Sequence, residues 1–410
     1  MKVAIVVKGF PVVTETFILN QITGLIDRNI HVDIYAFHRS QYSSNYHEII
    51  KRYNLIDRTI YLNEIPHKKL TRLGILIKLL FTCRSIKSLK NIIRSCNVFR
   101  YGRMALSLYL STMIYKLQDS PEYDIIHCQF GTVAPQILLL KEIGAIGGKI
   151  VTSFRGYDAT LYLKNNPGGY GNLFEKGDLF LPVSKSLKQI LINMTENKDK
   201  IKVLYSGIDT KKFNYTKRKF SDNGIVYCTT IARLTEKKGI FYGIKAVQKV
   251  LRYGYNVQYT IVGEGAFQPL IEKYIDANNL NQYVRLTGWK THEEIKVLLT
   301  NSHFLIAPSI TSNDGDREGI PNVLKEAMAT GVPVVTTNHS GIPELVENGV
   351  SGFVVPEKDV DALADRIIYL INHPEDCERV SCEGRKKIVS DFDIDKLNDQ
   401  LIKYYMLLVN

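Results

Sequence analysis

Two glutamates separated by seven residues, Glu318 and Glu326, flank the start of a predicted helix. Pro321 suits the first turn of that helix, where a missing N–H costs nothing, and Gly331 suits its C-terminal end. Helix-start amides favour a phosphate or another anion, and carboxylates accept hydrogen bonds from neutral hydroxyls. The pair therefore predicts a nucleotide-sugar site, with one glutamate for the ribose and one for the hexose. The alternative is that Glu326 solvates a helix face and Glu318 only caps the helix.

Several segments in chain order resemble the retaining family-4 glycosyltransferases, which have the GT-B fold. Besides the E-x7-E motif, the matching segments are Val203–Phe213 (N-G-[IV]-D, with Ser206 for Asn), Ile231–Ala246 (G-R-L-x-x-x-K-G), Ile261–Gly265, Val284–Trp289 and Gly349–Pro356. Asp314–Pro321 and the F-P-x-x-[ST]-E-T-F stretch Phe10–Phe17 resemble the branch that acts in colanic acid and similar exopolysaccharide pathways.

In the family that the chain resembles, an arginine and a lysine bind the donor diphosphate. Arg233 and Lys238 match the arginine and lysine of G-R-L-x-x-x-K-G. Fixed cations can stabilise the charge that develops on a departing nucleoside diphosphate, so the resemblance implies transfer without a metal or cofactor. The stretch Asp314–Asp316 matches the pattern of a metal-binding D-x-D motif. Because it lies in the loop before Glu318, we interpret it as a solvated turn. We expect no metal site.

The glutamates take separate roles in the resemblance. Glu326 matches the ribose-binding residue, and Glu318 matches the residue that contacts the donor sugar, with the amides of Gly319 and Ile320 beside it. A UDP-sugar is the favoured donor.

Three glycines are further donor-side candidates. Gly263 and Gly265 follow a predicted strand, where a nucleotide base could approach the backbone closely, and a simple tight turn is the alternative. Gly9 follows the first predicted strand and occupies the place of the glycine-rich phosphate loop of the family, of which only this glycine remains.

The acceptor half departs from the family at two positions that are often histidine. Gln129 stands for the second histidine of H-x-H, and Arg155 stands for the histidine of T-x-H-G-x-D. Gln129 can donate a hydrogen bond to a sugar, and Arg155 can hold a phosphate or the acceptor, but neither is a general base. We therefore favour a front-face route, in which the leaving phosphate accepts the proton of the acceptor hydroxyl. His127 is interpreted as a core histidine at a strand end.

The elements that must position these residues alternate as strands and helices in both halves of the chain. This predicts an α/β protein of the GT-B class, with two Rossmann-like doubly wound domains facing a central cleft. We expect an N-terminal acceptor-side domain at 1–210, a linker at 211–224 and a nucleotide-sugar-binding domain at 225–388. A helix at 389–410 should return to the first domain. The ten expected strands are Val3–Val7, Val32–Phe37, Ile125–Cys128, Lys149–Ser153, Leu179–Val183, Ile225–Ile231, Gln258–Val262, Val284–Thr287, Phe304–Ala307 and Val332–Thr336.

Most of the positive charge lies in one segment. The chain has 410 residues and a formal net charge of +12, and residues 64–116 hold eleven lysines and arginines against the single acid Glu64. Ile86, Leu89 and Ile93 recur at helical spacing beside Lys87, so this segment predicts a basic amphipathic helix. We expect Lys68–Arg103 to contact an anionic membrane surface; a solvated face of packed helices is the alternative. No nucleic-acid-binding motif accompanies the charge.

Together these features predict a retaining, metal-independent hexosyltransferase. It would move a sugar from a nucleotide donor to a growing, lipid-linked saccharide in capsule, exopolysaccharide or lipopolysaccharide synthesis. Alternatives are a nucleotide-sugar-binding subunit without turnover and an epimerase of the same fold. A nicotinamide oxidoreductase is disfavoured, because no G-x-G-x-x-G follows the first strand. No apolar run approaches a membrane span, and the six cysteines suggest free thiols. We expect a cytoplasmic protein, peripheral on the inner face of the membrane.

Overall fold

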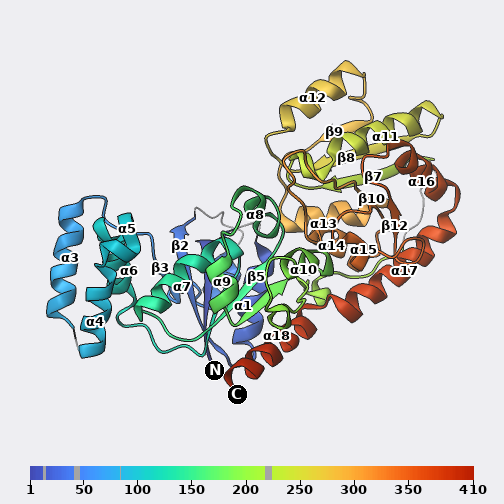
Figure 1. Ribbon diagram of the computed structural model, residues 1–410. Helices are drawn as coiled ribbons and strands as arrows, with labels where there is room; N and C mark the ends of the chain where they lie inside the picture. The colour runs from blue at the N-terminus through green and yellow to red at the C-terminus, as the bar shows by residue number, and fades with distance from the viewer. Residues whose placement is uncertain (13–14, 41–46, 84, 218–223) are drawn as a thin grey trace.

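Two parallel sheets of six strands each organise the chain (Figure 1). The computed structural model describes residues 1–12, 15–40, 47–83, 85–217 and 224–410. The strand order is β3-β2-β1-β4-β5-β6 in the first sheet and β12-β11-β10-β7-β8-β9 in the second. The strands are β1 Lys2–Phe10, β2 His31–Arg39, β3 Thr59–Tyr61, β4 Ile125–Cys128, β5 Lys149–Phe154, β6 Leu179–Pro182, β7 Val226–Ile231, β8 Val257–Val262, β9 Val284–Leu286, β10 Phe304–Ala307, β11 Val334–Thr337 and β12 Phe353–Val355. The expected GT-B architecture is confirmed.

Helices cover both faces of each sheet, which explains why the central strands are almost wholly apolar. Val3 to Val7 of β1, for example, are all fully buried. The helices against the first sheet are α1 Thr16–Ile26, α2 His47–Arg52, α7 Ala134–Ile143, α8 Leu161–Asn165, α9 Gly171–Lys176 and α10 Lys185–Ile192. Those of the second half are α11 Ile240–Arg252, α12 Gln268–Ala277, α13 His292–Asn301, α14 Asn322–Thr330, α15 Ile342–Leu345, α16 Val360–Asn372 and α17 Pro374–Asp391.

Three strands differ from expectation in informative ways. The first strand continues to Phe10, because Gly9 and Phe10 still pair with His38 and Arg39 of β2. The strands β3 and β12 were not expected; each has three residues, too few for a period-two pattern to stand out. Both lie at a sheet edge.

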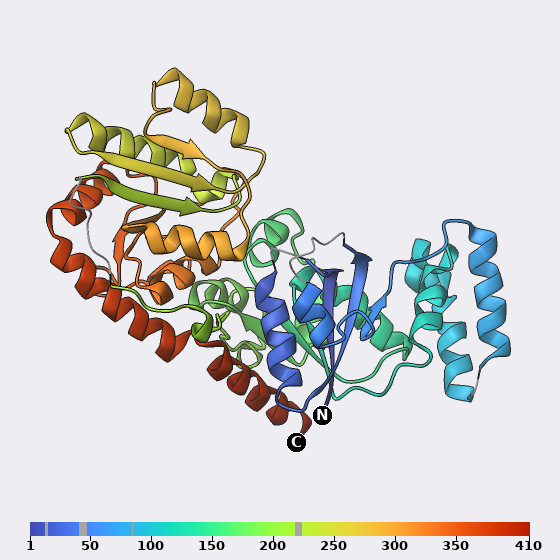
Figure 2. The ribbon, with the colours of Figure 1, turned by 180° about the vertical axis from the view of Figure 1, so that it is seen from behind.

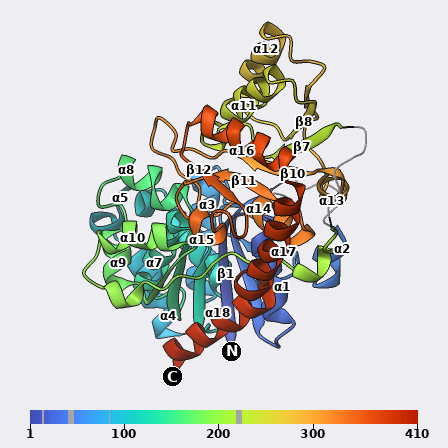
Figure 3. The ribbon, with the colours of Figure 1, turned by 90° about the vertical axis from the view of Figure 1, so that its right-hand side faces the viewer.

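The last helix, α18 (Ile394–Val409), lies against the first domain. Figures 1 and 2 show α17 and α18 following one another along the side of the molecule, with α18 next to α1 and the two termini close together. Figure 3 shows the same path from the side. Arg28, two residues after the end of α1, forms ion pairs with Asp395 (3.2 Å) and Asp399 (2.6 Å) of α18. The apolar face of α18 supplies Leu397, Leu401 and Tyr405 to the core beneath β1.

Four helices form a separate lobe at the end of the first domain that lies farthest from the second (Figures 1 and 2). They are α3 Lys69–Phe81, α4 Ile86–Ser95, α5 Val98–Leu106 and α6 Tyr109–Leu117, and we call them the helical lobe. Its small core joins Leu79, Ile92, Leu110 and Ile114 to Ile143 of α7.

The predicted basic helix corresponds to α4, but its apolar row does not face that core. Ile86, Leu89 and Ile93 are 76%, 39% and 61% exposed, respectively. Within the described ranges, no helix is long and apolar enough to cross a bilayer.

Candidate functional site

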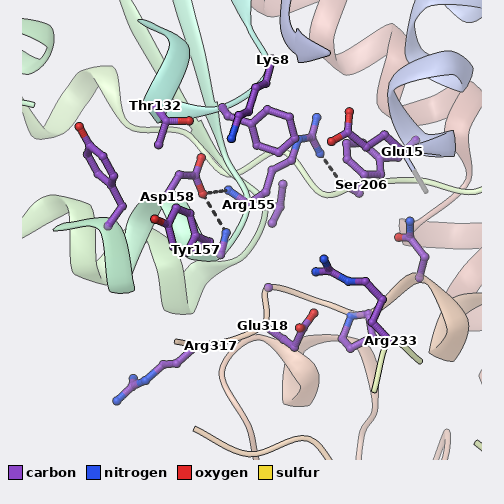
Figure 4. A pocket seen from close by; sticks show the side chains of 18 of the residues that line it. Lys8, Glu15, Thr132, Arg155, Tyr157, Asp158, Ser206, Arg233, Arg317 and Glu318 are labelled. Atoms are coloured by element: carbon purple, nitrogen blue, oxygen red, sulfur yellow. Dashed lines mark hydrogen bonds between the residues drawn. The ribbon is translucent and has the colours of Figure 1, made fainter. Parts of the chain in front are cut away.

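The main cavity lies between the two domains and has a volume of about 890 Å³. Figure 4 shows side chains from both domains around it, with Lys8, Glu15 and Arg155 on one side and Arg233 and Glu318 on the other. The strand ends of the two parallel sheets therefore border one cleft, as expected for ligand sites of this architecture.

Glu318 lies on the loop before α14 and forms ion pairs with two lysines. Its carboxylate is 3.1 Å from Nζ of Lys238 and 3.2 Å from Nζ of Lys237. Burial alone would raise the pKa of Glu318, but the two lysines outweigh it and hold the pKa at about 2. The loop is anchored by its backbone, since the Glu318 N–H donates to Nε2 of His339 (3.0 Å). Glu318 is therefore a fixed carboxylate at the cleft wall, ionised at any working pH.

The two predicted diphosphate cations line the same cavity. Lys238 belongs to a short helical turn before α11, Glu236–Lys238, and Arg233 lies on the loop after β7. The exposed Arg233 side chain makes no hydrogen bond or ion pair within the described residues. Arg233 is thus available to an anion, whereas Lys238 would have to exchange Glu318 for it.

Glu326 lies within α14 and is 9% exposed, and it does not line the main cavity. Burial raises its pKa to about 7, although the neighbouring Lys325 opposes that shift. Lys325 is fully buried and donates to the carbonyl of Ser206 (2.7 Å) and to Asn322 Oδ1 (3.0 Å). The Glu326 carboxylate has no such partner among the described residues. As predicted, Gly331 ends this helix in the left-handed conformation, at φ 81°.

Gly319 and Ile320 line the cavity beside Glu318, and the domains approach closely there. A Cβ on Gly319 would lie 2.7 Å from the Arg155 carbonyl oxygen, and a Cβ on Gly156 would lie 2.9 Å from that of Arg317. Glycine is required at both positions because the two loops touch through their backbones.

The other three glycines make backbone contacts within their own domain. A Cβ on Gly263 or Gly265 would lie 1.9 Å from the Ala232 oxygen or 2.4 Å from the Leu234 oxygen, respectively. The close approach that these glycines permit is therefore to the loop that carries Arg233. Gly9 lies inside β1, so its placement on a phosphate loop after the strand was wrong. None of the three lines the cavity.

The Arg155 side chain is held by residues of its own domain rather than standing free. Its guanidinium donates to the Gln129 carbonyl (3.1 Å), to Gln129 Oε1 (2.5 Å) and to the Ser206 hydroxyl (2.8 Å), and it lies over the Phe17 ring. Burial lowers its pKa to about 10, opposed by Asp158 and Glu15. Arg155 lines the cavity, but its guanidinium donates its hydrogen bonds to Gln129 and Ser206 and so holds them in place.

Gln129 is fully buried and does not line the cavity. Its amide donates to Gln21 Oε1 (2.6 Å) and accepts from Arg155. Direct contact of Gln129 with a sugar, as predicted, would require this pairing to break.

His127 is a core histidine, as interpreted from the sequence. Its ring nitrogens bind the Tyr405 hydroxyl (2.6 Å) and Ser153 Oγ (2.8 Å). Burial, with a smaller effect from Arg155, lowers its pKa to about 3, so the ring is neutral.

The D-x-D-like stretch is only partly the solvated turn that was expected. Asp314 is exposed, but Asp316 pairs with Lys237 at 2.8 Å. No group of side chains able to hold a metal occurs among the described residues.

Sequence reasoning assigned no role to Glu15, Lys237 or Lys325. Lys237 could have been noticed as a second lysine beside Lys238. Lys325 could not, because its burial depends on Ser206, 119 residues earlier.

Comparison with known proteins agrees with this geometry. Residues 14–212 match the model described as Glycosyltransferase Family 4, and residues 211–387 match that of Glycosyl transferases group 1. The chain is 35% identical to the putative colanic acid biosynthesis glycosyltransferase WcaL of Salmonella typhimurium, over 98% of each protein. It is also 35% identical to the amylovoran biosynthesis glycosyltransferase AmsK of Erwinia amylovora, over 96% of each.

Solved structures share the fold at low identity. A crystal structure of Anabaena HepE in complex with UDP-glucose superposes with a TM-score of 0.73 at 17% identity, covering 99% of this chain and 100% of that one. TarM gives a TM-score of 0.71 at 15% identity, covering 100% and 98%. With both of its halves matched by family models and full-length relatives at 35% identity, the chain belongs to the family-4, group 1 glycosyltransferases, retaining enzymes of the GT-B fold.

Proposed function

We propose that this glycosyltransferase moves a sugar from a UDP-sugar, with retention, to a growing lipid-linked saccharide in exopolysaccharide synthesis. The observation that carries the proposal is the cleft itself. Glu318, Lys238 and Arg233, whose side chain has no partner among the described residues, face the side chains of the other domain across about 890 Å³. The names of WcaL and AmsK, which concern colanic acid and amylovoran, support the pathway class.

On the donor side, Arg233 and Lys238 bind the diphosphate, Glu326 binds the ribose diol and Glu318 binds a hydroxyl of the donor sugar. The amides of Gly319 and Ile320 lie beside that hydroxyl. The loop carrying Gly263 and Gly265 shapes the nucleotide end. Binding of UDP-glucose by HepE supports a uridine nucleotide. The buried carboxylate of Glu326 has no hydrogen-bond partner among the described residues, which supports the ribose role because a diol would supply such bonds.

The front-face route fits the groups around the cleft. In that route the C1–O bond to the diphosphate breaks and leaves its electron pair on the phosphate. The acceptor oxygen bonds to C1 on the same face, and its proton passes to the leaving phosphate. Arg233 and Lys238 stabilise the resulting charge. His127 is neutral and fully buried, and Arg155 and Gln129 cannot accept a proton, which supports a route without a protein base at these positions. Gln129 and Arg155 act by holding the acceptor side of the cleft in shape.

The helical lobe supplies the membrane contact that a lipid-linked acceptor requires. Besides the row on α4, Leu70 and Phe81 of α3 and Phe99 of α5 are 81%, 87% and 106% exposed. Lys87, Lys90 and Arg94 are exposed on the same helix, α4, as Ile86, Leu89 and Ile93. Apolar side chains between cations suit the interface of an anionic bilayer, where both kinds of side chain find partners. The lobe would hold the enzyme at the cytoplasmic face of the membrane.

The domain limits that we propose are 1–210, a connection at 211–224, 225–388, and 389–410 as the returning helix. Residues 218–223 of the connection lie outside the described residues. The two sheets, β1–β6 and β7–β12, fall on either side of the connection.

The decisive experiment removes the diphosphate cations. Arg233→Ala combined with Lys238→Ala should weaken UDP binding about a hundredfold or more, the loss expected for two charged contacts, and should abolish donor turnover. Isothermal titration calorimetry measures the first effect and release of UDP from a panel of UDP-sugars the second. Arg252→Ala with Lys273→Ala removes two exposed cations of the same domain and should leave both unchanged. Unaltered UDP affinity in the Arg233/Lys238 variant would disprove the assignment.

A further inference from the structure

Glu15 is the carboxylate that the proposed donor site leaves without a role. Three acidic residues line the described part of the cleft: Glu15, Asp158 and Glu318. Asp158 accepts hydrogen bonds from the backbone N–H groups of Gly131, Arg155 and Gly156, and Glu318 is paired with lysines. Glu15 precedes α1, but its side chain makes no capping hydrogen bond, and no described residue gives it another. It is the acid of the described cleft that remains available to a ligand.

The surroundings of Glu15 show which ligand suits it. Figure 4 shows its side chain beside Arg155 and Ser206, across the cavity from Arg233. Burial raises its pKa to about 6, while the positive charges of Arg155, Arg233 and Lys8 oppose that shift. These cations belong to the end of β5, the loop after β7 and β1, so they surround the carboxylate from three elements. Glu15 is thus largely ionised at neutral pH inside a mostly cationic cleft.

A carboxylate at this position does not favour the donor nucleotide. A second anion near Arg233 repels a diphosphate, and the donor sugar is already faced by Glu318. A neutral, polyhydroxylated molecule is different, because its hydroxyls donate hydrogen bonds and bring no charge.

The same side of the cleft also offers aromatic surface. Phe17, Phe130, Tyr157 and Tyr162 line it, and the Tyr157 and Tyr162 rings lie 6.4 Å apart. An aromatic ring can pack against the C–H groups of a sugar, while a carboxylate beside it accepts hydrogen bonds from the hydroxyls. This part of the cleft therefore suits a sugar ring.

We propose that Glu15 binds the saccharide acceptor, its carboxylate accepting a hydrogen bond from a hydroxyl next to the one that reacts. The proposal rests on the proposed function, because it takes the other half of the cleft as the donor site. The reacting hydroxyl keeps its own proton for the leaving phosphate, so Glu15 positions the acceptor and selects for a hydroxyl at that place. It is a specificity-determining residue rather than a general base.

The test uses the full-length protein saturated with UDP and simple sugars as acceptor probes. Binding of methyl α-D-glucopyranoside, methyl α-D-galactopyranoside and methyl α-D-mannopyranoside is measured by saturation-transfer difference NMR. At least one should bind to the wild type at pH 7.5. Glu15→Ala should raise its dissociation constant about tenfold, as expected for one lost hydrogen bond to an ionised group. Glu15→Gln, which keeps an accepting oxygen, should lie between the two.

The pH dependence adds a readout that a structural defect would not give. Glycoside binding to the wild type should weaken as the pH falls through about 6, where Glu15 becomes protonated, and Glu15→Gln should remove this dependence. Glu122→Gln changes an exposed carboxylate outside the cleft and should behave as the wild type.

Three results would overturn the proposal. One is equal glycoside affinity in the wild type and Glu15→Ala. Another is loss of binding in Glu318→Gln but not in Glu15→Ala, since the sugar would then occupy the donor-sugar position. The third is a wild type that binds UDP but none of the glycosides. Failure of the proposed function has a different signature, because the wild type would then not bind UDP at all.

Discussion

The carboxylate of Glu318 lies 3.1 Å from the ammonium of Lys238, so two groups assigned to different parts of the donor are bound to each other in the free protein. The pair keeps both side chains ordered and neutralises a charge that would otherwise be partly buried. Donor binding must then exchange a protein partner for a ligand at both residues. The diphosphate replaces Glu318 at Lys238, while a sugar hydroxyl replaces Lys238 at Glu318.

Glu318→Gln should separate nucleotide binding from sugar transfer. Without the competing carboxylate, Lys238 and Lys237 are free for a diphosphate, so UDP should bind about three- to tenfold more tightly. Transfer should fall, because an amide accepts a hydrogen bond from the donor sugar less strongly than a carboxylate does. Calorimetry with UDP and turnover of the UDP-sugar measure the two effects. Glu293→Gln, an exposed acid paired with Lys296 on α13, is the matched control. Weaker UDP binding in Glu318→Gln would contradict the competition.

Glu326→Gln should stabilise the protein while damaging nucleotide binding. Burial raises the pKa of Glu326 in the folded protein to about 7, above the 4.5 of an exposed glutamate. Its ionisation therefore opposes folding increasingly as the pH rises from about 4.5 to 7, and fully above that. The variant should be more stable by roughly 1–3 kcal/mol at pH 8, and nearly unchanged at pH 4.5.

Two measurements check the Glu326 prediction. The thermal unfolding midpoint at the two pH values reports stability, and calorimetry with UDP should show about tenfold weaker binding, as for one hydrogen bond to a charged group. UDP binding to the wild type should tighten between pH 6 and 8, and the variant should lose that trend. An unchanged affinity at pH 8 would remove the ribose role from Glu326.

Arg155→His, which introduces the residue common in the family, should lower activity rather than raise it. A single imidazole cannot reach the Gln129 carbonyl, the Gln129 side chain and the Ser206 hydroxyl together, as the arginine fork does. Donor turnover should fall about tenfold or more, and Arg155→Lys should also be impaired because it keeps the charge without the fork. UDP affinity should change little in both. Wild-type turnover in Arg155→His would show that the bridge is dispensable.

Membrane attachment should depend on two separable sets of side chains in the helical lobe. The basic set is Lys87, Lys90 and Arg94, and the apolar set is Leu70, Phe81 and Phe99. Replacing the basic set by glutamine should reduce pelleting with vesicles of phosphatidylglycerol and phosphatidylcholine, and high salt should abolish that difference. Replacing the apolar set by serine should reduce pelleting at every salt concentration.

The control for the lobe replaces three lysines of the second domain, Lys273, Lys386 and Lys387, by glutamine. It changes the net charge as much as the basic-set variant does and should pellet like the wild type. If all the variants pellet equally, the lobe presents only a solvated surface.

Local spacing predicted those parts of the site that one segment builds. The order of Glu318, α14, Gly331 and β11 follows from residues adjacent in sequence, since caps and strand signals act over a few positions. The central strands were predicted for the same reason, because burial on both faces leaves a continuous apolar run.

Contacts over long sequence distances were not predictable from the residues alone. The sequence showed that Arg155 is a cation with several N–H donors. It did not show that one of these donors binds Ser206, 51 positions later, and is therefore not free for a ligand. Gln129 occupies a strand end that usually faces a cleft, yet Gln21 of α1 takes up its amide. Glu15 carried one usable signal, its place as the acid of the F-P-x-x-[ST]-E-T-F stretch Phe10–Phe17 in the acceptor half.

The hydrogen bond between His127 and Tyr405 joins the fourth strand to the last helix across 278 positions. Leu397, Leu401 and Tyr405 also belong to the core beneath β1. During synthesis, β1 emerges early, but the side chains that complete this core are made only after the whole second domain. Until α18 has been made, the core beneath β1 lacks the side chains of Leu397, Leu401 and Tyr405. The core of the domain that is made first is thus completed by the helix that is made last.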